Sequence, residues 1–329
     1  MTLRRCPLCR AAMLGPTDRT LAYPDGRVRA FARACGSCGL LLAEGVADGA
    51  GAEACRQALA RALEGAAFAV DPEAPYGLDV YTLRTAATRA GRGIVAEGWQ
   101  REALTAPHDG RAAAARLRDL GAGPPVALGV PCRPRELDGV LAGLAAHAAW
   151  AAEAVVLVDA PAAAEVVRAV PGFSAGVRVV SRPLGGDFAA QRNALQALSQ
   201  APWMLQLDAD ETLDHGTGRL VRALAGLAED GGALSVGLPR ENRVDGRLSD
   251  VFPDVQYRLN RRAVRYRGRV HERPDLGGDW RRGFIALAGA IVHHLSGDHV
   301  RARSRRYEEL DPGRGRPEEE AALLEPYRD

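Results

Sequence analysis

The stretch Trp203-Met204-Leu205-Gln206-Leu207-Asp208-Ala209-Asp210-Glu211 is an apolar run that ends abruptly in three carboxylates. Its apolar residues predict a strand that is buried on both faces, as strands of parallel sheets are. Ligands of such sheets bind beyond the carboxyl ends of the strands. As long as strand geometry persists, Asp208 and Asp210 point to the same side. The stretch therefore predicts a site with two neighbouring carboxylates.

Asp208 and Asp210 predict a divalent cation. Two ionised carboxylates this close repel each other unless a cation lies between them. Magnesium or manganese is usually held by one or two carboxylates together with substrate phosphates, so the pair favours a substrate that carries a diphosphate. The alternative is a solvated acidic turn after a core strand, because the tripeptide D-x-D often arises by accident.

The segments before this stretch predict an α/β fold with a parallel sheet. Residues 187–198 predict a helix that is capped by Asp187 and carries the polar trio Gln191, Arg192 and Asn193. Alternating strands and helices further upstream predict parallel pairing with right-handed crossovers. The expected strands are 126–130, 154–159 and 177–180, and the expected helix between the first two is 136–150.

Taken together, residues 124 to 309 resemble the family-two inverting glycosyltransferases, and within them the lipopolysaccharide-core β-glucosyltransferase group. Three motifs carry the resemblance: Arg192-Asn193 followed by Trp203 to Glu211, then Pro253-Asp254 with Arg258-Leu259-Asn260-Arg261-Arg262, and finally Val270-His271-Glu272. The resemblance implies a mostly parallel, Rossmann-like GT-A domain. It also implies that the chain transfers a sugar from a nucleotide-diphosphate donor to a hydroxyl group, or another nucleophile, of a glycan, lipid-linked glycan, peptide or small-molecule acceptor.

The resemblance also implies roles for individual residues. Asp208 and Asp210 would hold Mg²⁺ or Mn²⁺. Glu272 would act as the base, with Asp254 and His271 as the other candidates. At most one of the adjacent residues His293 and His294 would close the site. The residues expected to bind the donor are Asp159, Glu136, Arg192, Asn193 and Asp208.

Two departures from the family pattern support an alternative function. Cys132-Arg133-Pro134 and Ala160 to Ala164 replace residues that would offer hydrogen bonds to the nucleotide. A transferase-like module that has lost its chemistry and binds a carbohydrate or a protein is therefore the second hypothesis. A methyltransferase is disfavoured, because no G-x-G-x-G loop follows a first strand.

A run of arginines after the metal motif has two interpretations. Its members would meet a diphosphate or an anionic acceptor, because guanidinium forks fit phosphate oxygens. The alternative, favoured for most of them, is a solvated strand face. These arginines are Arg258, Arg261, Arg262, Arg265, Arg267 and Arg269.

The N-terminal region predicts a zinc ribbon. Cys6-Pro7-Leu8-Cys9 and Cys35-Gly36-Ser37-Cys38 are two C-x-x-C pairs, the ligand set of a structural zinc ion. Free or redox-active thiols are the alternative. The two remaining cysteines, Cys55 and Cys132, are expected to be small buried apolar residues. The ribbon is a possible protein docking surface, and no nucleic acid partner is expected because it lacks a basic stripe interleaved with aromatic residues.

The composition of the chain limits the classes of partner and the location that we expect. The 329 residues carry a formal charge of +2, which disfavours a generic binder of polyanions, and all 43 basic residues are arginine. No secretory signal or membrane span is predicted, so we expect a cytoplasmic protein or one peripheral on the inner membrane face.

The expected parts are a zinc-ribbon-like module (1–45), a helical connector (46–123), a GT-A domain (124–310) and a flexible tail (311–329). Helices are expected in the connector at 52–68, 81–104 and 111–120.

Overall fold

The computed structural model describes residues 3–46, 48–213 and 215–329, and it divides into two compact units. The first unit comprises most of the chain up to Leu120, together with Phe284–Ala288 and Asp329. The second comprises Gly121–Gly283 and Gly289–Arg328. No helix in these described ranges combines the length and the apolar character that crossing a bilayer requires.

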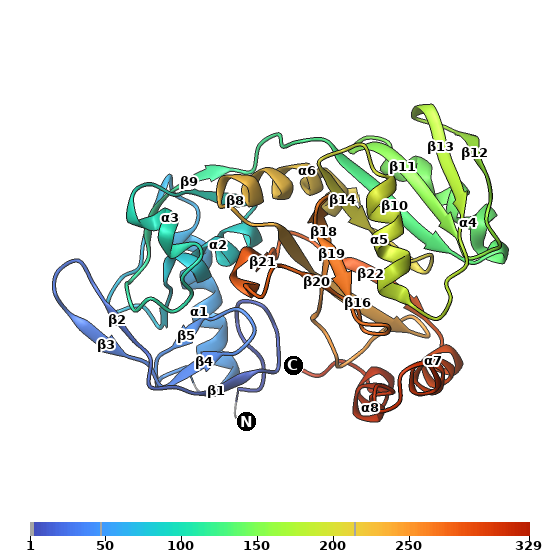
Figure 1. Cartoon of the computed structure of the whole chain (residues 1–329). Coiled ribbons are helices and arrows are strands. Elements are labelled where there is room, and N and C mark those ends of the chain that lie inside the picture. The colour runs from blue at the N-terminus through green and yellow to red at the C-terminus, as the bar shows by residue number, and fades with distance from the viewer. Residues whose placement is uncertain (1–2, 47, 214) are drawn as a thin grey trace. The chain divides into compact units, whose positions relative to one another are not determined.

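The described part of the first unit contains short antiparallel strands and three α-helices, α1 to α3 (Figure 1). Strands β1, β4, β5 and β7 form one sheet in that order, strands β6, β9 and β8 form another, and β2 pairs with β3. The bounds are β1 Leu14–Pro16, β2 Thr20–Ala22, β3 Val28–Ala30, β4 Arg33–Cys35, β5 Leu41–Leu42, α1 Gly49–Ala62, β6 Ala67–Ala69, β7 Tyr76–Gly77, α2 Val80–Arg89, β8 Arg92–Val95, α3 Trp99–Ala103 and β9 Ala114–Asp119.

The interval 46–123 is not purely helical, which corrects the expected secondary structure of this region. Residues 111–120 contain strand β9, because Ala115 and Leu117 are buried while Arg116 and Arg118 are exposed. This period of two is that of a half-buried strand, and it overrides the helix propensity of the alanines. Helix α2 ends at Arg89, just before Gly91, and β8 follows within the range expected to be one long helix.

The second unit is a mixed α/β structure around one large sheet (Figure 1). Its main path has the strand order β12-β13-β11-β10-β14-β18-β16-β22-β15, and β17 pairs with β16. The bounds are β10 Val126–Cys132, α4 Leu137–Leu144, β11 Ala151–Val158, β12 Ala163–Val170, β13 Phe173–Ser181, α5 Phe188–Leu198, β14 Trp203–Gln206, β15 Glu211–Leu213, α6 His215–Asp230, β16 Ser235–Val244, β17 Arg247–Leu248, β18 Asp254–Arg261, β19 Arg265–Arg267, β20 Arg273–Asp275, β22 Ile291–Leu295, α7 Gly297–Leu310 and α8 Pro317–Leu324. Strand β21 Gly283–Ile285 begins at the last residue of this part of the second unit, and its other two residues belong to the first unit.

The four expected strands of the second unit are confirmed as parallel neighbours. Strand β10 pairs in parallel with β11 and with β14, and β11 pairs in parallel with β13. Strand β12 was not predicted. It is an exposed antiparallel edge strand, and its first residues, Ala163 and Ala164, belong to the alanine-rich stretch 160–164.

Helix α5 packs on β10 and β11 and thereby positions the polar trio. Asp187 caps the helix, as predicted, by accepting a hydrogen bond from the Ala190 amide at 2.8 Å. Leu195 lies in a buried apolar cluster that includes Ala127 of β10 and Met204 of β14. Arg192, one turn earlier on the same helix, therefore lies beside the carboxyl end of β14.

The C-terminal segment 311–329 is not merely a flexible tail, which corrects the expectation. It contains helix α8, whose Leu323 is only 2% exposed and packs with Val244, Leu295 and Val300. Pro317 at the first position and three glutamates in the first turn favour a helix start, because they suit its backbone geometry and its dipole. The expectation rests on the abundance of Pro and Glu, which is typical of disordered segments, although the same residues favour the start of a helix.

The start of the second unit yields a stability prediction. A Cβ atom on Gly123 would lie 1.8 Å from the Arg222 carbonyl oxygen of α6. We therefore expect Gly123→Ala to destabilise the second unit by about 1–3 kcal/mol, the usual cost of overpacking. Urea unfolding measures the loss. The control is Gly121→Ala, where an added Cβ meets no atom within 4 Å. Equal unfolding midpoints for the two variants would contradict the prediction.

Candidate functional site

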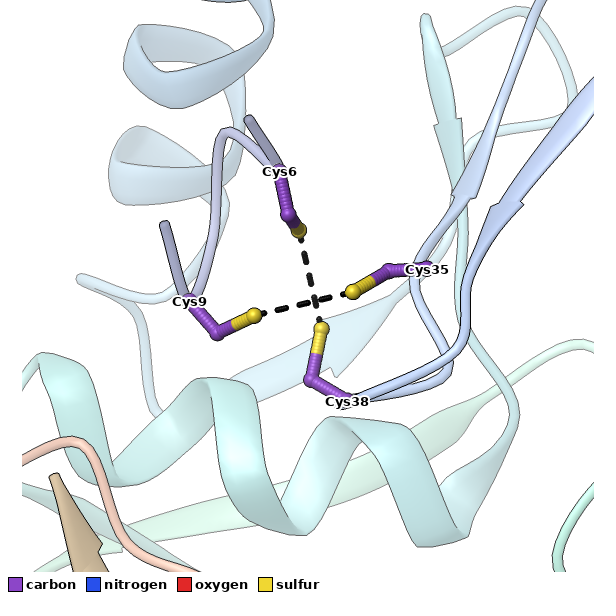
Figure 2. Close-up of side chains that lie close together, drawn as sticks. All are labelled: Cys6, Cys9, Cys35 and Cys38. Carbon is purple, nitrogen blue, oxygen red and sulfur yellow. Dashed lines mark hydrogen bonds between the residues drawn. The ribbon is translucent and has the colours of Figure 1, made fainter. Parts of the chain in front are cut away.

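The four cysteines of the two C-x-x-C pairs converge in the first unit (Figure 2). The Sγ atoms of Cys6 and Cys38 are 3.7 Å apart, and those of Cys9 and Cys35 are 3.6 Å apart. Tetrahedral zinc with Zn–S bonds of about 2.3 Å requires sulfur separations of about 3.8 Å. The geometry therefore fits one zinc ion. Nowhere else in the described ranges do three or more His, Cys, Asp or Glu ligand atoms cluster this closely.

The two cysteine pairs share one backbone arrangement. The Arg10 amide donates to the Cys6 carbonyl and the Gly39 amide donates to the Cys35 carbonyl, both at 2.9 Å. Arg10 and Gly39 each follow the second cysteine of their pair with a positive φ, 69° and 85°. Each turn thus bends back on itself so that both of its sulfurs face inward. The two remaining cysteines, Cys55 and Cys132, are buried with free thiols, as expected.

Three arginines surround the cysteine cluster. Arg89 donates to the Leu8 carbonyl at 2.5 Å, Arg19 to the Gly39 carbonyl at 3.2 Å and Arg5 to the Arg10 carbonyl at 2.9 Å. Four thiolates around a divalent ion carry a net charge of −2. Positive charges held on the turns themselves offset that charge, which favours a bound cation with four thiolate ligands.

A second cluster lies at the carboxyl end of β14 in the second unit. Asp208 is paired with two arginines: its Oδ1 lies 2.7 Å from Arg192 Nη2, and its Oδ2 lies 2.9 Å from Arg258 Nη2. Burial raises the pKa of Asp208 to about 7, although the charge of Arg192 opposes this shift. The two oxygens of Asp208 thus hold the guanidinium groups of Arg192 and Arg258 side by side.

Asp210 has a different partner from Asp208, because strand geometry ends at Gln206, before either residue. Asp210 Oδ2 lies 3.4 Å from His293 Nε2, and His293 Nδ1 lies 2.8 Å from Asn242 Oδ1. Asn242 donates to Asp254 through Nδ2, so its Oδ1 accepts a hydrogen bond from His293 Nδ1–H. A neutral His293 then has no proton on Nε2, the atom beside the Asp210 carboxylate. Burial lowers the pKa of His293, which favours this neutral form.

Glu211 and Asp254 share Arg240. Arg240 Nη1 lies 2.9 Å from Glu211 Oε1, and its Nε donates to Asp254 Oδ2 at 3.0 Å. Asp254 also accepts hydrogen bonds from Asn242 and Gln256. Although burial opposes the shift, the charge of Arg240 and these hydrogen bonds lower the pKa of Asp254 to about 2.

Glu272 reaches the cluster from the loop between β19 and β20. Its Oε1 accepts a hydrogen bond from Nε of Arg192, whose side chain is buried. The structure thus brings Arg192, Asp208 and Glu272 into direct contact. Asp254 does not contact these residues directly. It pairs with Arg240, Arg240 pairs with Glu211, and Glu211 accepts a hydrogen bond from the Asp208 amide.

Three expected donor-binding residues make other contacts. Asn193 bonds the Tyr266 backbone through both polar atoms of its side chain, at 2.6 and 2.9 Å. Asp159 accepts from the Leu184 amide at 2.8 Å, and Glu136 accepts from the Arg133 amide at 2.7 Å. Asp159 and Glu136 follow the carboxyl ends of β11 and β10, where they hold loops in place.

Sequence reasoning missed several members of the cluster, namely Glu211, Arg240 and Asn242. Arg240 and Asn242 are polar residues two apart on β16, and both are buried. The one available signal was that polar pair directly after an apolar run, because buried polar side chains require partners. The adjacent histidines point to different surroundings, as expected: His293 is buried beside Asp210, while His294 is exposed and lies 3.0 Å from Thr212 Oγ1. Whether His293 closes the site stays a prediction.

The environment of Asp254 predicts an acid-dependent stability. A carboxyl group whose pKa is lowered on folding contributes stability above its unfolded pKa of about 3.9, and this contribution is lost as the pH falls towards 2. We expect about 2–3 kcal/mol of unfolding free energy to disappear progressively between about pH 5 and pH 1.

The measurement is the urea unfolding free energy of the second unit as a function of pH, for the wild type and for Asp254→Asn. The variant should lack this acid-dependent loss. Parallel pH curves for the two proteins would contradict the assignment, whatever their difference in absolute stability.

Comparisons with known proteins give little similarity. No protein-family model and no curated protein sequence matches the chain. A structure of S. aureus TarS matches with a TM-score of 0.34 and 10% identity, over 60% of this chain and 42% of that one. A structure of S. aureus TarS 1-349 matches with a TM-score of 0.32 and 10% identity, over 60% and 70%. The chain thus spans less than half of the first of these proteins, and similarity at this level carries no functional argument.

Proposed function

We propose that the chain is a metal-dependent inverting glycosyltransferase, with a GT-A-type catalytic domain at about 124–310 that resembles the family-two enzymes. The observation that carries the proposal is the pair Asp208 and Asp210 beyond the carboxyl end of the parallel strand β14, each with a different polar partner. This edge of a parallel sheet is where ligands of α/β folds bind.

Asp210 and His293 are the proposed protein ligands of Mg²⁺ or Mn²⁺. A carboxylate oxygen and a bare imidazole nitrogen, 3.4 Å apart, face each other there. Two protein ligands are too few for a closed cage, which suits an ion that takes its other ligands from substrate phosphates and water. When bound, such an ion would act as a Lewis acid on the leaving diphosphate.

Arg192 and Arg258 supply positive charge beside this position. Their guanidinium groups are buried against Asp208, so their positions are fixed before any ligand arrives. Planar forks of this kind bind phosphate oxygens bidentately. We propose that these two arginines orient the diphosphate of a nucleotide-sugar donor, with Asp208 holding them in place.

The proposed base is Glu272. It joins the cluster through Arg192, and among the described residues Arg192 is its one ion-pair partner. Asp254, the other candidate, is held by Arg240, Asn242 and Gln256, and its lowered pKa makes it a poor proton acceptor.

A second candidate function is a carbohydrate- or protein-binding module without transfer activity. The side chains of Asn193, Asp159 and Glu136, which the family resemblance assigns to the donor, bond the backbone of this chain instead. Those contacts favour the second function. The Cys6, Cys9, Cys35 and Cys38 site serves either function as a structural zinc site and a possible protein docking module.

The test is to incubate the protein with a panel of nucleotide-diphosphate sugars and Mn²⁺ and to measure nucleotide release and donor binding. The proposal expects metal-dependent release, and it expects Asp210→Asn to raise the Mn²⁺ concentration needed for half-maximal release by about tenfold or more, as loss of a charged ligand should.

Thr212→Ala is the control, because Thr212 lies two residues on and pairs with the exposed His294. Donor binding without any release would favour the binding module. Release that is indifferent to metal and to Asp210→Asn would contradict the proposed site.

A further inference from the structure

The most strongly charged segment of the second unit lies between residues 261 and 282. It contains eight arginines and three carboxylates, which leaves a formal charge of +5, whereas the whole chain carries +2. All eight arginines are exposed. They are Arg261, Arg262, Arg265, Arg267, Arg269, Arg273, Arg281 and Arg282.

Strands β19 and β20 form a two-stranded sheet (Figure 1), and three of these arginines belong to it. Arg265 pairs opposite Asp275, and Arg267 pairs opposite Arg273. Opposite residues of an antiparallel pair, and residues two apart on one strand, project to the same side. Tyr266, between the first two arginines, is 3% exposed and points to the other side. Arg265, Arg267 and Arg273 therefore form an outward arginine face.

The charge of the arginine face is only partly compensated. Asp275 pairs with Arg267 at 2.6 Å. Arg273 donates to the Val255 carbonyl at 3.3 Å, and Arg265 donates to the Arg262 carbonyl at 2.7 Å. These carbonyls orient the guanidinium groups without cancelling their charge. Because like charges directly opposite each other destabilise a sheet, the Arg267–Arg273 pair favours an anionic partner.

Trp280 distinguishes among anionic partners. Its side chain is 62% exposed and is followed directly by Arg281 and Arg282. It lies five residues after Asp275, so the chain keeps it within about 17 Å of the arginine face. Exposed tryptophan beside arginines is typical of the headgroup level of a membrane. A nucleic acid site would present several aromatic side chains for base stacking, whereas the other aromatic residue of this segment, Tyr266, is buried.

We propose that the arginine face and Trp280 bind the surface of a membrane that contains anionic phospholipid. The guanidinium forks contact lipid phosphates, and the indole enters the headgroup layer. The loop from Gly268 to Glu272 joins β19 to β20 and carries Glu272 to Arg192, so the face adjoins the candidate site. The inference does not depend on the transfer reaction.

Sedimentation with lipid vesicles tests the proposal. The full chain should bind vesicles of phosphatidylglycerol mixed with phosphatidylcholine, should not bind phosphatidylcholine alone, and should dissociate as salt is raised. The triple variant Arg265→Gln, Arg267→Gln, Arg273→Gln should lower the partition coefficient about a hundredfold, because each arginine near an anionic surface contributes roughly fivefold.

The matched control is Arg27→Gln, Arg56→Gln, Arg116→Gln. It removes the same charge from the first unit, where Arg27 and Arg116 are exposed, Arg56 is partly exposed, and each arginine pairs with a carboxylate. This variant should bind vesicles like the wild type. Equal losses for the two triple variants would overturn the proposal, because net charge alone would then explain the binding.

Tryptophan fluorescence gives an independent readout in a protein with all its arginines. The emission of the wild type should shift to the blue on addition of anionic vesicles, and Trp280→Phe should remove that shift while most of the binding remains. An unchanged shift in Trp280→Phe would overturn the role of this residue. Tighter binding to duplex DNA than to anionic vesicles, with the same loss in the Arg265, Arg267, Arg273 variant, would assign the face to nucleic acid instead.

Discussion

Cys38→Ser is expected to remove a bound zinc ion and to unfold the first unit, while the second unit stays folded. The four sulfurs lie within 4.8 Å of one another inside the apolar cluster that includes Leu8, Leu40 and Leu41. Small zinc domains bind the metal with a free energy of about 10–16 kcal/mol, and this binding free energy stabilises the folded state because the unfolded chain has no preformed site. Elemental analysis measures the metal, and thermal unfolding should show two transitions, of which the variant keeps the one belonging to the second unit.

The matched control for this experiment is Cys55→Ala. Cys55 belongs to the same unit and is fully buried, but it lies outside the cluster of four cysteines. This variant should retain one zinc ion per chain at some cost in packing, and a chelator should abolish the first transition in both the wild type and the control. Carefully purified wild-type protein without zinc would contradict the assignment, and so would a Cys38→Ser variant that keeps both transitions.

The strands that build the candidate site were predictable because their signal is local. Strands β10 and β14 are short apolar runs bounded by Gly, Pro or Asp, and such runs are typical of strands that are buried on both faces. The position of Asp208 and Asp210 at the carboxyl end follows from the chain direction alone. The two cysteine pairs were equally predictable from the sequence, because each turn is complete within five residues.

The partners of these carboxylates were not predictable, because they arrive from distant strands. His293 meets Asn242 since β22 runs parallel to β16 in a register that sets these two residues side by side. Arg240 faces Asp254 because β16 and β18 pair antiparallel with those residues opposite each other. No local periodicity encodes either register. In the same way Asn193 bonds Tyr266 because α5 packs beside β19, which its own helix pattern does not reveal.

Glu272→Gln is expected to lower the turnover of the proposed transfer about a hundredfold or more, while donor and metal binding stay near normal. An inverting transfer requires a group that takes the proton of the acceptor hydroxyl, and losing a general base typically costs a factor of 10²–10⁴. Glutamine retains an oxygen that accepts the hydrogen bond from Arg192 Nε, but it does not take up a proton. Single-turnover rates at saturating donor separate this effect from binding.

Asp254→Asn is the informative comparison, because it removes a carboxylate that is tied to Arg240 and Asn242. A pKa of about 2 leaves Asp254 almost no affinity for a proton at neutral pH, so its loss should reduce stability and disturb Arg240 more than it slows proton transfer. If Glu272→Gln turns over normally and Asp254→Asn is inactive with donor binding intact, the base is Asp254. Its pKa would then have to rise when donor and acceptor bind, which requires Arg240 to leave the Asp254 carboxylate and pair with Glu211 alone.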